Sequence, residues 1–152
     1  MKKIPLTQGK FALVDDEDYG VLVLRKWHYS HYGYAAARGG RNKTTYMHRV
    51  LSSPPLGLEV DHINGDRLDN RRENLRNVTR RQNNMNRKSR KNTSSQFKGV
   101  HFRKDTKKYT AYIDHGKNRV RLGCFNTEKG AALAYNEAAI KRFGEFARLN
   151  II

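Results

Sequence analysis

The chain has 152 residues, and its 31 lysines and arginines outnumber its 14 aspartates and glutamates, which gives a formal net charge of +17. This length allows one ordinary domain or a few small ones, and the excess of positive charge indicates a polyanionic partner, most simply a nucleic acid. One cysteine excludes an internal disulfide and a cysteine-based zinc site, and fits a reducing cytoplasm. No apolar run approaches a membrane span, and the first residues lack the apolar segment of a secretion signal.

Residues 1–46 are predicted to form a small mixed unit. A strand is expected over 11–14, and the four consecutive acids that follow favour the positive end of a helix over 17–25. Segments 32–38 and 43–47 alternate as strands around a turn rich in glycine. The aromatic residues of this unit are interpreted as its core in preference to a base-stacking surface: Trp27, Tyr29, Tyr32 and Tyr34.

The segment 58–88 alternates between short apolar stretches and polar stretches, which predicts several short elements. A short apolar run leads into Asp61 and His62, and a loop rich in Gly, Asp and Asn follows. A second short strand is predicted before Thr79, which is suited to cap a helix over 80–88. This order of strand, loop, strand and helix puts Asp61 and His62 at the end of the first strand, where the helix can lie across them.

Three side chains of this segment offer the groups that phosphodiester hydrolysis requires. A hard cation such as Mg²⁺ prefers oxygen ligands and keeps several waters, so the Asp61 carboxylate and the Asn83 amide oxygen suffice to hold it, whereas zinc is less suited to these donors. His62 is suited to act as a general base, because an unperturbed imidazole titrates near neutral pH. Neighbouring residues on a strand face opposite ways, so Asp61 can face the metal while His62 faces the attacking water. Asn84 or Asn86 takes the place of Asn83 if the helix register differs.

The motifs MHR (47–49), VDHINGDRLDNRRENLR (60–76) and VTRRQNN (78–84) together resemble the HNH endonucleases of phages and mobile introns. The resemblance implies a ββα-metal (His-Me finger) core and a DNA endonuclease that nicks or cuts both strands with Mg²⁺ or Mn²⁺. It also implies the cytoplasm of a bacterial or phage-infected cell.

The resemblance assigns roles by position. His62 matches the general base, Asp61 and Asn83 match the metal ligands, and Asn74 matches the loop asparagine that fixes the backbone of the histidine. His48 and Arg49 match a pair near the scissile phosphate; the alternative is an exposed pair on a short helix. Asn70 is interpreted as a turn residue.

The part of the chain between Asn74 and Lys104 contains ten basic residues and no acidic one. Such a run is typical of contact with a phosphate backbone. The arginines of this run that we expect at DNA are Arg76, Arg80 and Arg87.

Residues 97–152 alternate as three short strands with short connections, which predicts an antiparallel meander. Thr127 is expected to cap a helix that ends near Gly144. Cys124 is interpreted as a small apolar strand residue.

This C-terminal part resembles the plant APETALA2/ethylene-response DNA-binding domain through FKGV (97–100), YTAYI (109–113), RLGCFNTE (121–128), AALAYNEAA (131–139) and GEFARLN (144–150). The resemblance implies a three-stranded sheet in the major groove with one helix packed behind it. The residues that it places at DNA are Lys98, His101, Arg103, Tyr109, Arg119 and Arg121.

We therefore predict an α+β protein with an N-terminal unit (1–46), a ββα-metal nuclease core (47–90), a basic linker (91–96) and a C-terminal DNA-binding domain (97–152). The predicted function is a metal-dependent homing endonuclease that hydrolyses double-stranded DNA at sites selected by the C-terminal domain. It is expected to act as a monomer, without a small-molecule cofactor or a membrane partner. The alternatives are a sequence-specific DNA-binding protein with a decayed nuclease core, and an RNA-binding protein.

Overall fold

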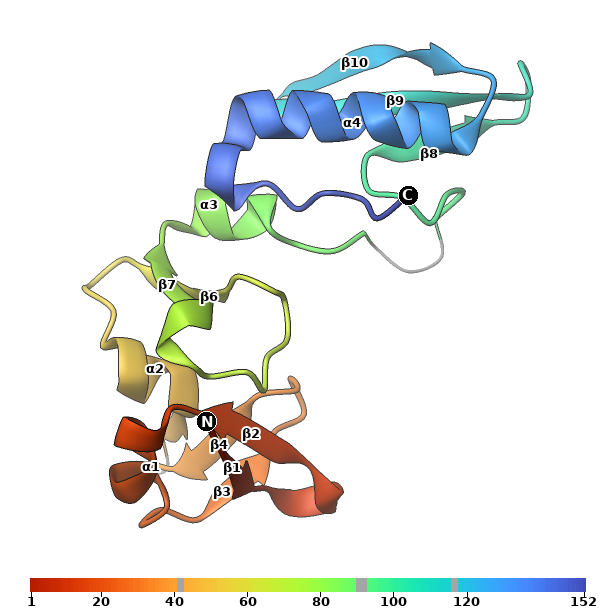
Figure 1. Ribbon diagram of the computed structural model, residues 1–152. Coiled ribbons are helices and arrows are strands. Elements are labelled where there is room, and N and C mark those ends of the chain that lie inside the picture. The colour runs from red at the N-terminus through yellow and green to blue at the C-terminus, as the bar shows by residue number, and fades with distance from the viewer. Residues whose placement is uncertain (41–42, 90–92, 116–117) are drawn as a thin grey trace. The chain divides into compact units, whose positions relative to one another are not determined.

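The computed structural model of the protein describes residues 1–40, 43–89, 93–115 and 118–152 (Figure 1). Parts of three predicted features lie outside these residues: the turn at 39–42, the linker at 91–96 and the turn at 115–117. The chain forms two compact units, Met1–Asn83 and Asn84–Ile152. Both contain helices and strands, so the predicted α+β class is confirmed. None of the helices in the described residues is long and apolar enough to cross a membrane.

The N-terminal unit opens with a hairpin of β1 (Lys2–Pro5) and β2 (Phe11–Val14), followed by α1 (Asp16–Leu22). Strands β3 (Trp27–Tyr29), β4 (Ala35–Arg38) and β5 (Thr44–Tyr46) then form an antiparallel sheet in that order. Helix α2 (Met47–Ser52) follows directly. The structure thus adds β1 and β3 to the predicted elements, and α1 ends three residues earlier than expected. Trp27 Nε1 donates to the Leu22 carbonyl at 2.7 Å, which satisfies one of the free carbonyls at this helix end.

A single hydrophobic core is shared by residues 1–46 and the segment that follows, which were predicted to be separate units. Met47 is fully buried in this core with Trp27, and Leu51 of α2 and Leu68 of the following loop pack against it. The segment that was predicted as the nuclease core therefore shares a hydrophobic core with the first 46 residues. The compact unit that results ends inside α3, and not at a boundary between residues 46 and 47.

The central segment contains β6 (Glu59–His62), a 3-10 helix η3 (Arg72–Asn74), β7 (Leu75–Val78) and α3 (Arg80–Met85). Strands β6 and β7 pair antiparallel. Thr79 caps α3 as predicted: its hydroxyl accepts from the Gln82 amide at 3.3 Å, while Gln82 Oε1 accepts from the Thr79 amide at 2.8 Å. The helix is shorter than the predicted range of 80–88.

The C-terminal unit contains β8 (Val100–Arg103), β9 (Lys108–His115) and β10 (Asn118–Phe125) as an antiparallel sheet in the order β10-β9-β8. Helix α4 (Glu128–Phe143) packs on one face of it through Ala131, Ala132, Tyr135 and Ala139 (Figure 1). Thr127 accepts the Gly130 amide at 3.1 Å as the N-cap. Gly99 has φ of +77°, and a Cβ there would lie 2.1 Å from Tyr135 Cδ2, so only glycine fits at this approach of strand and helix.

Candidate active site

Asp61 and His62 end strand β6, and both are buried, with 6% and 5% of their surface exposed. The register of the hairpin places Asp61 opposite Arg76 of β7. Arg76 donates from Nη2 and Nε to Asp61 Oδ2 at 2.9 and 3.0 Å. Arg76, expected at DNA, is therefore a largely buried partner of the proposed metal ligand, because the pairing of β6 with β7 brings it there.

The His62 imidazole lies in a group of rings. Its centroid is 5.2 Å from that of His48 and 5.9 Å from that of Tyr34. Its Nε2 lies 3.4 Å from Asn70 Oδ1. Burial lowers the pKa of His62 below its ordinary value, although the hydrogen bond to Asn70 and the nearby carboxylates act in the opposite direction. The imidazole is therefore neutral at neutral pH.

His48 of α2 is held between aromatic rings. It stacks on Tyr46 with a centroid separation of 5.6 Å and an interplanar angle of 11°, and Tyr34 lies 4.9 Å away. Its Nδ1 is buried and has no hydrogen-bond partner in the part of the chain that the structure describes. Burial, followed by the charges of His62 and Arg49, lowers the pKa of His48 to about 3. His48 is thus a neutral neighbour of His62, whereas Arg49 is exposed.

Asn74 connects the two sides of the loop after His62. Its Oδ1 accepts from the Asn64 amide at 2.9 Å, its Nδ2 donates to the Asp69 carbonyl at 2.8 Å, and its carbonyl accepts from the Ile63 amide at 2.9 Å. These three bonds fix the backbone immediately after His62.

Asn70 was interpreted as a turn residue, but in the structure its side chain is also buried against His62. It is 1% exposed, its amide donates to the Leu13 carbonyl at 2.8 Å, and its Oδ1 faces His62. Its Nδ2 donates to the Leu68 carbonyl at 3.1 Å, which fixes which end of the amide is the oxygen. Sequence reasoning missed this contact, because it depends on β2 lying against the loop.

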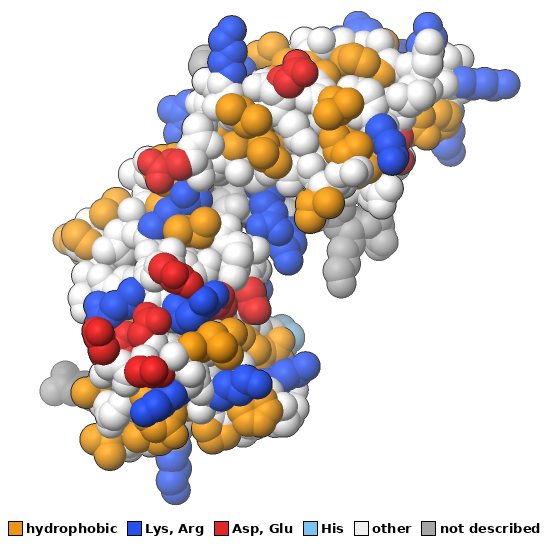
Figure 2. Space-filling view, in the orientation of Figure 1, with side chains coloured by type: hydrophobic (Ala, Val, Ile, Leu, Met, Phe, Trp, Pro, Cys, Tyr) orange, Lys and Arg blue, Asp and Glu red, His pale blue; other side chains and the backbone are white. Residues whose placement is uncertain are grey.

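The acidic run at the N-terminus of α1 (residues 15–18) also binds this loop. Asp15 Oδ2 accepts from the Arg72 amide at 2.7 Å, and Asp18 accepts from Arg72 Nη2 and Nε at 2.6 and 2.8 Å. Figure 2 shows acidic side chains gathered on the unit that contains α1. The run therefore fixes the loop as well as starting the helix.

Asn83 of α3 donates from Nδ2 to Glu59 Oε2 at 2.6 Å, so its amide group is anchored to the start of β6. The alternative Asn84 is exposed and accepts from Arg87 Nη1 at 3.4 Å, and Asn86 is buried. Arg80 and Arg87 are exposed. Among residues 1–40, 43–89, 93–115 and 118–152, no three His, Cys, Asp or Glu side chains are placed so that together they could hold a metal ion.

The outer face of the C-terminal sheet, away from α4, carries a second group of polar residues. Alternation along the strands puts His101, Arg119 and Arg121 on this face, opposite the residues in the core. Tyr112 lies among them: its ring is 5.7 Å from that of His101, and the Arg119 guanidinium lies 5.8 Å from its centroid. Arg103 and the exposed Cys124 lie on the same face.

Two residues that were expected at DNA, Tyr109 and Lys98, are not on this outer face. Tyr109 packs with Phe102, at 5.0 Å between centroids, against the core beneath the sheet. The period of two along β9 explains this, because Tyr109 shares a face with the buried Ala111, and Tyr112 takes the outer position. Lys98 precedes β8, and its ammonium donates to the Met85 carbonyl.

Comparison with known proteins supports the predicted resemblance of the central segment to HNH endonucleases. A family profile for HNH endonucleases matches residues 53–85. An uncharacterized HNH endonuclease of Acanthamoeba polyphaga mimivirus is 30% identical over 149 residues, which cover 95% of this chain and 77% of that protein. The chain belongs to the HNH endonuclease family. No solved structure matches it.

Proposed function

We propose that this protein is a divalent-metal-dependent DNA endonuclease in which His62 is the general base. The observation that carries the proposal is the consecutive pair of Asp61 and His62, both buried at the end of β6 inside the segment that matches the family. In this position one residue offers a carboxylate and the next offers a neutral imidazole. Nuclease chemistry at DNA also agrees with the positive charge of the chain.

His62 is prepared to accept a proton. Because Asn70 Oδ1 is an acceptor, it favours the tautomer with the proton on Nε2, and the basic lone pair is then on Nδ1. A water that loses its proton to this nitrogen becomes the nucleophile that attacks phosphorus. Asn70 and Asn74 are positioning residues in this proposal, since one orients the ring and the other holds the backbone after it.

Asp61 and Asn83 would hold the metal. Their oxygen donors, one of them anionic, fit a hard cation such as Mg²⁺ or Mn²⁺. A bound cation supplies charge neutralisation at the phosphate and at the leaving oxygen. Glu59 orients the amide of Asn83, and Arg76 balances the buried carboxylate of Asp61.

His48 keeps a place in the proposal, with a changed role. A neutral, buried imidazole does not neutralise a phosphate, so His48 is assigned to position His62 through their ring contact. The exposed Arg49, Arg80 and Arg87 are assigned to phosphates of the DNA backbone.

The C-terminal unit is proposed to select the site of cleavage, as in homing endonucleases, in the manner of an APETALA2-like domain. Its outer sheet face presents arginines around an aromatic ring, a combination suited to base edges and phosphates. The residues assigned to DNA on this face are His101, Arg103, Tyr112, Arg119 and Arg121. Tyr112 replaces Tyr109, which packs against the core on the opposite face of the sheet.

The test is cleavage of supercoiled plasmid by His62→Ala in the presence of Mg²⁺. Removal of a general base is expected to slow nicking by about 10²- to 10⁴-fold and to leave DNA binding nearly unchanged. EDTA is expected to stop cleavage by the wild-type protein in the same way. The matched control is His28→Ala, which changes an exposed histidine on β3 and should cut at the wild-type rate. Wild-type cleavage by His62→Ala would refute the assignment.

One contact favours the alternative of a DNA-binding protein with a decayed nuclease core. Arg76 already provides Asp61 with a positive partner, which competes with a metal ion for the same carboxylate. A pure protein that shifts plasmid bands with Mg²⁺ or Mn²⁺ but produces neither nicks nor linear DNA would establish this alternative.

A further inference from the structure

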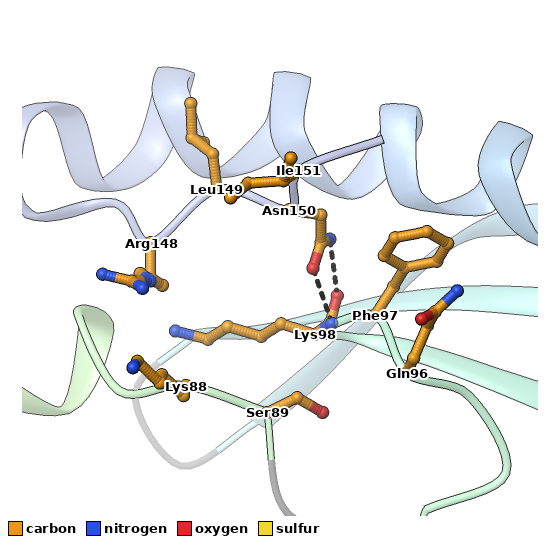
Figure 3. Close-up of a pocket in the computed structure, with 9 residues that line it drawn as sticks. All are labelled: Lys88, Ser89, Gln96, Phe97, Lys98, Arg148, Leu149, Asn150 and Ile151. Atoms are coloured by element: carbon orange, nitrogen blue, oxygen red, sulfur yellow. Dashed lines mark hydrogen bonds between the residues drawn. The ribbon is translucent and has the colours of Figure 1, made fainter. Parts of the chain in front are cut away.

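A small cavity in the C-terminal unit, distinct from the outer sheet face, is lined by three cations. Its volume is about 220 Å³, and its walls come from the segment after α3, the approach to β8 and the C-terminal tail. Lys88, Lys98 and Arg148 supply the charge, and none of the described lining residues is acidic. Figure 3 shows the Lys98 side chain extending between those of Lys88 and Arg148.

Two asparagines hold the cavity in shape. Asn136 of α4 bonds both backbone groups of Asn150, accepting from its amide at 2.8 Å and donating to its carbonyl at 2.9 Å. Asn150 in turn accepts from the Lys98 amide at 2.7 Å and donates to the Lys98 carbonyl at 3.1 Å (Figure 3). The tail that carries Arg148 is thereby fixed against the strand segment that carries Lys98, before any ligand binds.

The cations that line the cavity act on one another. The Lys98 ammonium is a three-proton donor and gives one hydrogen bond to the Met85 carbonyl. Burial, together with the positive charges of Arg148 and Arg87, lowers the pKa of Lys98 to about 8, although the Asp114 carboxylate acts in the opposite direction. Partly buried like charges repel each other, and a bound anion removes that repulsion.

We propose that this cavity binds a phosphate group, with the phosphodiester backbone of DNA as its source. Its volume lies below the range of about 300–1,000 Å³ that is usual for small-molecule sites, so it suits one phosphate more than a whole cofactor. Lys88 and Ser89 continue directly from the exposed Arg87, in the basic run that we expect along a backbone. The assignment of DNA as the source of the phosphate rests on the proposed function, whereas the binding of a phosphate group does not depend on it.

The first arm of the test measures binding of the full chain to a short duplex in EDTA, so that cleavage plays no part. Fluorescence anisotropy over a series of salt concentrations gives the slope of log affinity against log salt. Lys98→Gln and Arg148→Gln are each expected to reduce this slope by about 1, since each removes one phosphate contact. Lys129→Gln makes the same charge change on the exposed part of α4, outside the cavity, and is expected to leave the slope unchanged.

The second arm measures the melting temperature with inorganic phosphate at constant ionic strength. A ligand that binds the folded protein raises the melting temperature, so phosphate should stabilise the wild-type protein and Lys129→Gln more than Lys98→Gln or Arg148→Gln. Circular dichroism without phosphate confirms that the variants are folded.

The combined results separate the sources. Reduced salt slopes support a backbone phosphate. Unchanged slopes with phosphate stabilisation that the cavity variants lose support a phosphate site filled by a free anion. If neither property distinguishes the cavity variants from Lys129→Gln, the proposal is overturned. These outcomes can be interpreted even if His62→Ala does not affect cleavage, because neither arm of the test measures cleavage.

Discussion

Replacement of His48 by phenylalanine should make the N-terminal unit more resistant to acid. Burial lowers the pKa of His48 from 6.5 to about 3, so the unfolded chain binds a proton near pH 5 that the folded chain excludes. The free energy of unfolding therefore keeps its full value above pH 6.5, where His48 is neutral in both states, and decreases progressively as the pH falls toward 3. Phenylalanine keeps the ring between Tyr34 and Tyr46 and removes the titration.

The expected magnitude follows from the shift. At about 1.4 kcal/mol per pKa unit, the proton costs the folded state about 2 kcal/mol at about pH 5 relative to about pH 7, and about 3 kcal/mol at about pH 4. His62 and the carboxylates add their own pH dependence, and they do so in both proteins. The wild-type protein should therefore lose about 2 kcal/mol more than His48→Phe between the two higher pH values.

Urea unfolding followed by the fluorescence of Trp27 measures this difference. Trp27 is the one tryptophan of the chain and lies in the same core as α2, so it reports the unit that contains His48. His28→Phe, at an exposed position of β3, shows what an added phenyl ring does by itself. Equal losses of stability in the wild-type protein and His48→Phe would show that His48 is not buried in its neutral form.

Two further predictions concern the proposed site and the DNA face. Asn70→Ala should slow plasmid cleavage about tenfold and move the acidic limb of the pH–rate profile to lower pH, because the hydrogen bond that raises the pKa of His62 is lost; an unchanged profile would contradict the positioning role. Tyr112→Ala should weaken duplex binding by about 1 kcal/mol, measured by anisotropy, because Arg119 loses its aromatic partner. Tyr109→Ala should instead lower the melting temperature, and the opposite pattern would reverse the assignment of the two faces.

Patterns along the chain predicted most of the elements around the site. The apolar run before Asp61, the loop rich in Gly and Asn, and the Thr79 cap identified β6, β7 and α3 within a few residues. These signals are local: a cap or a period of two depends on residues that are near in sequence. The same period of two would have separated Tyr109 from Tyr112, had the buried face of β9 been identified first.

The contacts that complete the site span larger separations. Arg72 binds Asp18 across 54 positions, and Asn70 reaches His62 because the loop is anchored to β2 by the Leu13 carbonyl. Such contacts form only after the chain has folded back on itself, so no short pattern marks them.

The family resemblance, the basic character and the adjacent Asp61 and His62 could all be read from residue identity and local order. The surroundings of these residues became known only from the folded chain. Burial makes the two histidines neutral, the β6–β7 register gives Asp61 its arginine, and the packing of α4 turns Tyr109 inward. Burial and charge pairing depend on which distant segments exclude water from a side chain, and local order does not specify those segments.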